Sequence, residues 1–381
     1  MGITTNQSSA PVFVDQAVFT SIRSPMGEGY RIVTASPGVR PEEKAEITRR
    51  APSHAALCDG SESAAGMMAF ILTSGRHCVG FSCHAGKEHT GRGGLRVYSH
   101  FVLLNAEEFA RFGSHAGQIA GAARSAVADA LVLKQAATAG KLSLAFADPL
   151  TGLSFKKSGV DQIKQILGIA RLMMSDRPGA VALCQDGVRL IDAALTCVPA
   201  AIRARFALSA GVRYSPSRQL QFCLVNPDGG ETQRALRGQT VALVDCLSSD
   251  ICAGRGPFDA WFEFVNRKVN AGAWDTIAHL TARLAHAVTP ERLGRVVRMC
   301  DDLVLIQGAD AADLELIRSR WDGIHVDFEP ELSLFTKLRA GIERRLVATT
   351  PALKNHSGLP EHSLPAWNSP SAETADATSP R

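Results

Sequence analysis

The stretch from residue 16 to residue 41 constrains the fold of this chain more than any other. Its sequence is QAVFTSIRSPMGEGYRIVTASPGVRP, in which β-branched and aromatic residues form two arms around a turn. Gly27-Glu28-Gly29 marks that turn, because glycine adopts the positive φ angles that tight reversals need. The stretch therefore predicts an antiparallel hairpin with strands over 12–21 and 30–35.

A helix is predicted directly after this hairpin. Ser36-Pro37-Gly38 is a second turn signal, and Pro41 followed by two glutamates is typical of a first helical turn. Proline is accepted there because its missing N–H has no intrahelical acceptor, and acidic side chains stabilise the positive end of the helix dipole. We expect this helix to run to about Arg50, before Pro52.

A second block, from residue 88 to residue 104, is the expected partner of the first; its sequence is EHTGRGGLRVYSHFVLL. Side chains alternate along a strand, so one face of 96–104 receives Val97, Ser99, Phe101 and Leu103, and the other Arg96, Tyr98, His100 and Val102. Asn105 and Glu108 form a capping box that starts a helix. With a hairpin over 68–73 and 77–83, the front of the chain predicts an antiparallel sheet of about five strands with two helices.

The middle of the chain predicts an α/β segment. The predicted elements are, in order, an Ala-rich helix over 117–134, a strand over 142–146, a helix over 158–174, a strand over 180–184, a basic helix with Arg203 and Arg205, and strands over 220–225 and 241–244. Ser158 is the expected cap of its helix, and Gly187 is expected to form a turn. Helices that alternate with strands favour an α/β arrangement.

The rest of the chain predicts helices only. Beyond Pro257 apolar residues recur at helical spacing, and Thr289-Pro290-Glu291 has the cap and proline that start a helix. The last helix has an apolar seam of Leu334, Leu338, Ile342 and Leu346.

The predicted fold class is therefore α+β. An N-terminal antiparallel sheet layer with helices and a middle α/β segment form a domain over 12–250, and an all-helical C-terminal region forms a second domain over 257–350. We expect disorder in residues 1–11 and in the tail 351–381, which is rich in Pro, Ser and Thr.

Charge and cysteine content narrow the function classes. The net charge is +4, and the basic residues are scattered, so nucleic-acid binding is not expected. The nine cysteines show no disulfide spacing and no secretory signal precedes them, which favours reduced cysteines in a cytoplasmic protein. No apolar run approaches the ~20 residues that span a bilayer, so no membrane association is expected.

The glycine-rich loop 91–94 is the first candidate site. The preceding segment 80–87 approaches a phosphate-binding P-loop, but it has one residue too many between its glycines and is followed by Glu88 instead of Ser or Thr. Nucleotide binding there is rejected. The amides of the loop 91–94, with Arg92 and Arg96 beside them, are able to bind an anion. A plain hairpin loop is the favoured interpretation.

Four residues near this loop, Cys78, Cys83, His84 and His89, are potential zinc ligands. Cys78 and Cys83 lie five positions apart on one predicted strand, so their side chains face opposite sides of the sheet. The spacing also matches no usual zinc motif, and we expect no metal site.

A cysteine nucleophile remains an open alternative. Cys83 or Cys58 would need His54 or His100 beside it, and one sequence does not show such proximity. Burial of the cysteines is the simpler expectation. We expect His100 to be a hydrogen-bonded residue of the sheet.

A basic neighbourhood follows in the middle segment. It consists of Arg203, Arg205, Arg213 and Arg218, with Tyr214 among them. Such a group is able to bind phosphate or an acidic partner. A solvated surface of helix and loop is the favoured interpretation.

Three blocks, QAVFTS…GYRIVTASPG, PSHAAL and TGRGGLRVYSHFVLL, together resemble the N-terminal domain of the bacterial GTPase-associated protein family. The segment VPAAIRARFALSAGVRYSPSR is similar to a downstream block of that family, so the resemblance covers roughly residues 12 to 226. The matching positions are Gln16, Ser21, Gly29, Tyr30, Ser36, Pro37, Gly38, His54, Arg92, Gly93, Arg96, Tyr98 and His100. The resemblance implies a protein from a bacterial multi-gene system, in defence or signalling, that encodes a GTPase nearby. It supplies no catalytic residues.

The functional prediction is a non-enzymatic adaptor or regulator that binds another protein, either a GTPase or its complex. The alternative is a hydrolase that uses a Cys/His pair, or that acts on a phosphorylated substrate, in the cleft between the sheet layer and the α/β segment. We predict no catalytic residue, no cofactor and no metal. The residues predicted to bind a partner or ligand are His54, Arg92, Arg96, Tyr98, His100 and Arg218.

Overall fold

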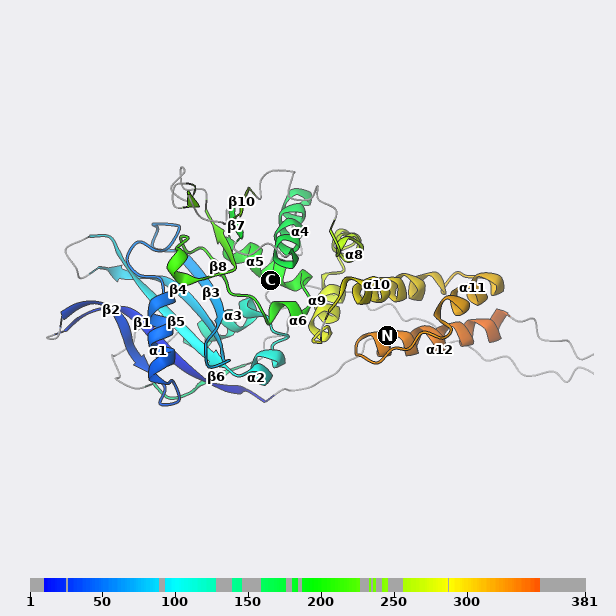
Figure 1. Cartoon of the computed structure of the whole chain (residues 1–381), viewed down its shortest axis with the longest axis horizontal. Coiled ribbons are helices and arrows are strands. Elements are labelled where there is room, and N and C mark those ends of the chain that lie inside the picture. Colours follow the sequence, from blue (N-terminus) through cyan, green and yellow to red (C-terminus); the bar gives the residue numbers. More distant parts are fainter. Residues whose placement is uncertain are drawn as a thin grey trace, which may run out of the picture.

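The computed structural model shows an α+β protein, as the sequence predicts (Figure 1). The structure describes residues 10–24, 27–88, 93–127, 139–145, 159–175, 180–183, 187–226, 233, 236–237, 242–245, 256–286 and 288–349. The two ends that were predicted to be disordered lie outside the described residues, apart from residues 10 and 11. None of the described helices combines the length and the apolar character that crossing a membrane requires.

Five antiparallel strands form the N-terminal half of the sheet. They are β1 (Val12–Ser24), β2 (Gly27–Ala35), β3 (Ala65–Ile71), β4 (His77–Lys87) and β5 (Leu95–Leu104). Their order is β3-β4-β5-β1-β2, so β1 lies between its hairpin partner β2 and the second block's strand β5. The predicted pairing of the two blocks is thus confirmed. Strand β2 begins earlier than predicted, because Gly27 and Gly29 adopt positive φ angles of 123° and 146° within the ladder.

The strands of the middle segment continue the same sheet. They are β7 (Ala180–Leu183), β8 (Leu208–Ala210), β9 (Phe222–Val225) and β10 (Ala242–Asp245), and they pair in parallel in the order β10-β7-β9-β8. Strand β8, which we did not predict, joins them to β3 in antiparallel orientation. A short strand β6 (Leu142–Leu144) pairs with β1. The α/β prediction holds, but these strands extend the N-terminal sheet and form no layer of their own.

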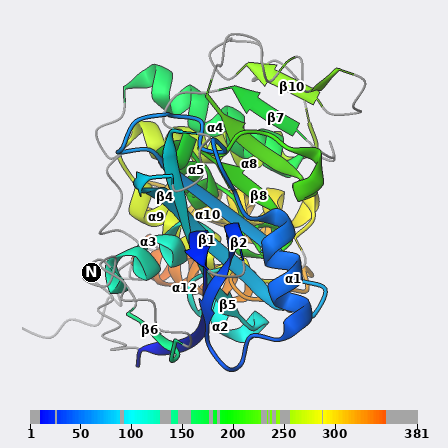
Figure 2. The same cartoon turned by 90° about the vertical axis from the view of Figure 1, so that its left-hand side faces the viewer.

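Helices α1 (Pro41–Arg50) and α3 (Ala116–Ala126) cover opposite faces of the antiparallel half, as Figure 2 shows. Helix α1 has the predicted bounds, with Pro41 in its first turn. Helix α2 (Ala106–Arg111) begins with the predicted capping box, in which Asn105 and Glu108 bond to each other's backbone N–H. The predicted continuation of α3 over 128–134 lies outside the described residues.

Three helices of the middle segment are α4 (Val160–Met174), α5 (Gly187–Cys197) and α6 (Ala200–Arg203). The prediction of a turn at Gly187 is wrong, because this residue begins α5. That helix is almost entirely apolar and buried, so it lacks the polar face by which a surface helix is recognised. The predicted cap at Ser158 is also wrong: Gly159 occupies the N-cap, and Ser158 lies outside the described residues.

The C-terminal helices are α8 (Asp259–Asn270), α9 (Trp274–Arg283), α10 (Pro290–Leu305), α11 (Ala311–Trp321) and α12 (Glu331–Thr349). Helices α8 and α9 pack on α4 and α5, and the Trp261 indole donates to the Cys197 carbonyl at 3.0 Å. Helices α10 to α12 extend from the body as an arm (Figure 1). The domain boundary between 250 and 257 stays a prediction, although apolar packing is continuous between α5 and α8.

Separate hydrophobic cores lie on the two sides of the antiparallel sheet. The core on the α1 side contains Phe19, Phe70 and Phe101 from the strands and Ile47 from the helix. The larger core on the other side joins the opposite faces of these strands to α3, α4, α5, α8 and α9. A further core lies in the arm, where Leu338 and Ile342 are buried and Leu334 and Leu346 pack beside them, as the predicted seam requires.

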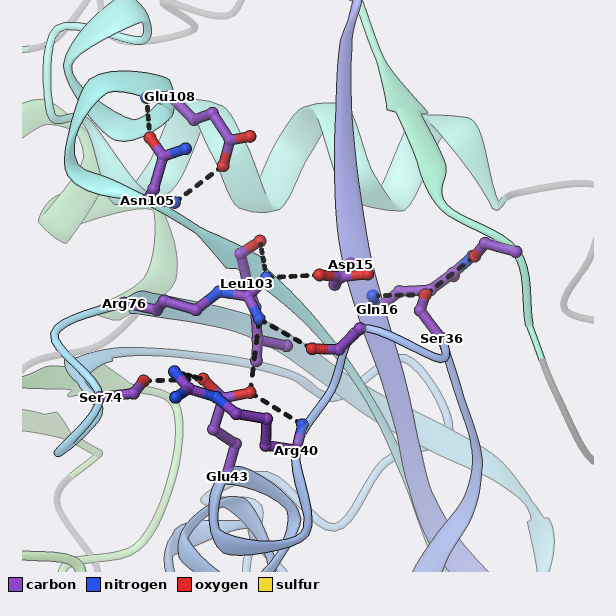
Figure 3. A network of polar contacts seen from close by, with 12 residues as sticks. Asp15, Gln16, Ser36, Arg40, Glu43, Ser74, Arg76, Leu103, Asn105 and Glu108 are labelled. Carbon is purple, nitrogen blue, oxygen red and sulfur yellow. Dashed lines mark hydrogen bonds and ion pairs between the residues drawn. The ribbon is translucent and has the colours of Figure 1, made fainter.

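Charged residues fasten α1 to its side of the sheet (Figure 3). Arg76, between β3 and β4, donates to Asp15 Oδ2 at 2.7 Å and to the Leu103 carbonyl at 3.1 Å, and its Nη1 lies 3.3 Å from Glu43 Oε2. Glu43, whose side chain is 2 % exposed, also accepts from Ser74 Oγ at 2.7 Å. Each buried carboxylate thus meets a cation, which offsets the cost of removing it from water.

Candidate functional site

Strand β5 carries three of the predicted binding residues, and all three side chains point to the side of α3. Tyr98 and His100 are 6 % and 1 % exposed, so neither is accessible to a ligand. The prediction of a hydrogen-bonded histidine is wrong: His100 packs on Phe81, and its ring nitrogens meet no partner among the described residues. Burial lowers the pKa of His100 to about 4. Arg96 lies at the start of the strand, where its Nε donates to the Ala85 carbonyl.

His54 and Arg218 lie on the other side of the sheet, near α1. His54 Nδ1 is 3.9 Å from Oε2 of Glu88. Arg218, in the 3₁₀ helix η3 (Pro216–Arg218), is buried, and its Nε donates to the Arg50 carbonyl at 3.1 Å. Arg92 lies outside the described residues. The five predicted residues that the structure describes are therefore divided between the two faces and form no common site.

Glu88, which sequence reasoning did not select, is the centre of a polar cluster. Ser21 Oγ donates to its Oε1 and the Tyr30 hydroxyl to its Oε2, both at 2.6 Å, and the Val97 N–H donates to Tyr30 at 3.0 Å. Burial and the bond to Glu88 raise the pKa of Tyr30. Ser21, Tyr30 and His54 are three of the positions that carry the family resemblance. Because Ser21 lies on β1, Tyr30 on β2 and Glu88 directly after β4, the cluster fastens the hairpin β1-β2 to the end of β4. No local pattern reveals it, since the partners of Glu88 lie far away in the chain.

A cavity of about 220 Å³ opens on the α3 side, between the N-terminal sheet and α5. Four elements line it: the start of β3, the middle of β4, helix α3, and the first turns of helix α5. The lining residues are Ala65, Gly66, Met67, Phe81, Ser82, Cys83, Gly117, Ala120, Gly121, Arg124, Val188, Arg189 and Asp192. The cavity lies between the sheet layer and the middle segment, where sequence reasoning placed the cleft of the alternative function. Cys83 lines this cavity and was a candidate nucleophile of the alternative function, whereas Val188, Arg189 and Asp192 were not predicted because α5 was missed.

Asp192 is a lining residue whose side chain is 28 % exposed, although one of its carboxylate oxygens is enclosed. The enclosed oxygen, Oδ1, accepts no hydrogen bond from the described residues. His115 Nδ1 lies 3.5 Å from it. Burial raises the pKa of Asp192 to about 6, with Arg203 acting in the opposite direction. Burial and the charge of Arg203 lower the pKa of His115 well below its usual value, so the imidazole is neutral.

The basic neighbourhood around residue 203 is the solvated surface that we favoured only in part: Arg205 and Arg213 are exposed, whereas Arg203 and Arg218 are buried. Arg203 is 4 % exposed, and its Nε donates to the Val198 carbonyl at 2.6 Å. Burial lowers the pKa of its guanidinium to about 9. Arg218, on the α1 side, is buried as well and donates to the Arg50 and Arg213 carbonyls. Each of these two arginines thus bonds to backbone carbonyls in the interior and does not present its charge to a partner.

The cysteines near the glycine-rich loop face opposite sides of the sheet, as predicted. Cys78 is in the core on the α1 side, whereas Cys83 packs against the larger core. Burial raises the pKa of both thiols, which disfavours the thiolate that a nucleophile requires. Within the described ranges, no three Cys, His, Asp or Glu side chains are grouped so that they could hold a metal ion.

Comparison with known proteins bears on the strands and helices at the front of the chain. No curated protein matches the chain. Residues 13–135, which contain β1 to β5 and α1 to α3, match the family described as GTPase-associated protein 1, N-terminal domain type 2. The match ends at residue 135, so the resemblance of the downstream segment 198–218 to the same family stays a prediction. This match confirms that the three blocks within residues 13–135 resemble the N-terminal domain of the GTPase-associated protein family.

Proposed function

We propose that this chain is a non-enzymatic adaptor or regulator in a bacterial, cytoplasmic GTPase-linked system, and that it acts by binding another protein. The partner is the GTPase of that system or a complex that contains it. The link to a GTPase rests on the family match over residues 13–135. The non-enzymatic part rests on one observation: the candidate reactive groups lie on opposite faces of the sheet, with Tyr98 and His100 buried on one face and the partly exposed His54 on the other.

The chemistry of the cysteines supports the same proposal. A thiol hydrolase needs a thiolate at neutral pH, usually beside a histidine. Burial raises the pKa of Cys83, and raises the pKa of Cys223 to about 11 and that of Cys197 to about 12. These thiols are therefore protonated at neutral pH and suit packing better than catalysis.

The test is a binding measurement with purified proteins. The full chain is titrated calorimetrically against the GTPase encoded beside it, loaded either with GDP or with a non-hydrolysable GTP analogue. We expect saturable binding in at least one nucleotide state, and none to a GTPase from an unrelated system. Absence of binding in both states contradicts the proposal. Hydrolysis of a phosphate ester or thioester that is lost in Cys83→Ser would instead favour the enzyme alternative.

A further inference from the structure

We infer that the cavity between β4, α3 and α5 binds a small organic anion with an apolar body and a hydrogen-bond donor at its far end. This inference goes beyond the proposed function, because it requires neither a protein partner nor a reaction. Three features of the cavity carry it: an apolar middle, a basic end and an acidic end.

The middle of the cavity suits an apolar body. Met67 and Phe81 from the sheet, Ala120 from α3 and Val188 from α5 line it, and its volume of about 220 Å³ far exceeds the ~30 Å³ that one water occupies in the liquid. The space exists because α3 presents small residues there. A side chain added at Gly121 would meet no atom within 4 Å. Apolar surface that remains in contact with water in such a space favours an apolar ligand.

One end of the cavity suits an anion. Arg124, one turn beyond Gly121 on α3, and Arg189, at the start of α5, both line it and reach solvent. A guanidinium presents its N–H groups in a planar fork that matches carboxylate and phosphate oxygens. An anionic group bound between α3 and α5 would remain partly hydrated, so its desolvation would cost little.

The other end suits a hydrogen-bond donor. Asp192 packs against Gly117, seven residues before Arg124 and therefore about 10 Å away along α3. The Gln118 N–H donates to His115 Nδ1 at 3.3 Å, which places the imidazole proton on Nε2, beside Thr196 Oγ1. His115 Nδ1 then has no proton to give to Asp192. The Asp192 side chain is 28 % exposed, so a hydroxyl or amino group of a ligand would donate a hydrogen bond to the exposed part of its carboxylate, which no described residue supplies.

A rigid probe tests this arrangement in the full-length chain. 6-Hydroxy-2-naphthoate carries a carboxylate and a hydroxyl at opposite ends of an apolar ring system, 2-naphthoate lacks the hydroxyl, and 2-naphthol lacks the anion. Fluorescence or calorimetric titration is expected to give the order hydroxynaphthoate, naphthoate, naphthol, with at least a tenfold affinity difference between the first and the last. A titration of 2-naphthyl phosphate against 2-naphthoate shows whether the basic end prefers phosphate or carboxylate.

Two substitutions locate the probe. Gly121→Leu places a side chain in the cavity from an ordinary helical position and is expected to abolish binding. Arg124→Glu is expected to lower the affinity of 6-hydroxy-2-naphthoate at least tenfold, with little effect on 2-naphthol. The matched controls, both on α10, are Gly294→Leu, where an added side chain also meets open space, and Arg298→Glu at an exposed position. Both controls should bind like the wild type.

Several outcomes would overturn the inference. They are saturable binding that Gly121→Leu leaves unchanged, equal affinities for 6-hydroxy-2-naphthoate and 2-naphthol, and no saturable binding of either naphthoate up to millimolar concentration. Circular dichroism and melting temperature show whether each variant is folded. Because the titration contains no partner protein, its failure leaves the adaptor proposal standing, and failure of the GTPase titration leaves this inference standing.

Discussion

The two sides of the N-terminal sheet differ in how completely their buried polar groups are paired. On the α1 side charged groups meet partners: Arg76 bonds to Asp15 and lies beside Glu43, and Glu88 accepts hydrogen bonds from Ser21 and Tyr30. On the α3 side the Tyr98 hydroxyl, both nitrogens of His100 and Asp192 Oδ1 are enclosed without a hydrogen-bond partner among the described residues. Single atoms of Asp15, Arg50 and His54 on the α1 side also lack a hydrogen-bond partner among the described residues, but Asp15 and Arg50 form ion pairs through other atoms. The cavity lies on the α3 side.

This difference indicates that the two sides of the sheet have different roles. Buried polar groups in folded proteins nearly always have partners, so groups without them point to strain or to a ligand. The α1 side has the properties of a fixed scaffold. The α3 side contains the cavity and two buried side chains, those of Tyr98 and His100, that have no hydrogen-bond partner at any polar atom among the described residues. Substitutions that affect one side more than the other therefore test the comparison directly.

The largest effect is expected from Arg76→Ala. The substitution leaves Asp15 buried without its cation and removes one of the two cations beside Glu43, which keeps Arg40. Removal of one partner from a buried pair costs about 3 kcal/mol or more of unfolding free energy. Arg23→Ala is the matched control, because the Arg23–Glu28 pair is exposed and contributes almost nothing. Urea unfolding of both variants gives the comparison. Equal losses in the two variants would show that the α1 side does not depend on this network.

His100 gives the α3 side its own pH dependence. Its pKa is about 4 in the folded chain against 6.5 in the unfolded chain, so between these pH values the unfolded state binds more protons. Stability is therefore complete above pH 6.5, falls as the pH drops towards 4, and loses on the order of 3 kcal/mol from this residue. The lowered pKa of His115 likewise makes stability fall as the pH drops. The raised pKa of Asp192 has the opposite effect, because it makes stability fall as the pH rises through about 6.

The variant His100→Leu isolates this contribution. Urea unfolding of the variant and the wild type at several pH values between 7 and 4 is expected to give stability curves in which the wild type loses more stability than the variant on acidification. The groups at His115 and Asp192 are present in both proteins, so they cancel in the difference. Parallel curves would contradict the view that the imidazole is buried without a hydrogen bond.

Glycine substitutions probe the packing of the two sides with smaller effects. In Gly80→Ala on β4 the new methyl group would lie 2.5 Å from the ring of Phe101, and such overpacking costs about 2 kcal/mol. Gly121→Ala on α3 meets open space and replaces a glycine in a helix, so it should stabilise the chain by roughly 0.5–1 kcal/mol. Thermal unfolding measures both. A lower melting temperature in both variants would mean that the α3 side is packed as tightly as the α1 side.

Local chemistry made much of the fold predictable. The hairpin β1-β2, helix α1 and the capping box at Asn105 follow from glycine, proline and cap residues within a few positions of each other, and the structure confirms them. Helix α5 was missed because burial on all sides leaves no polar face, and the glycine at its start is equally typical of a turn.

The candidate site was less predictable for a related reason. Strand alternation correctly placed Tyr98 and His100 on one face, but it gave no indication that helices would cover that face and bury them. The partners of Glu88 and the residues around the cavity come from segments far apart in the chain. Only the assembled sheet brings them together, so no spacing within the sequence reveals them.

Amide hydrogen exchange of the full chain, with and without saturating 6-hydroxy-2-naphthoate, tests the difference between the two sides most directly. We predict slower exchange in α3, in the first turns of α5 and in the middle of β4, with no change in α1 or β2, because the cavity lies on the α3 side alone. Protection of α1 and β2 equal to that of α3, or no protection of α3 and α5 at saturation, would contradict the account.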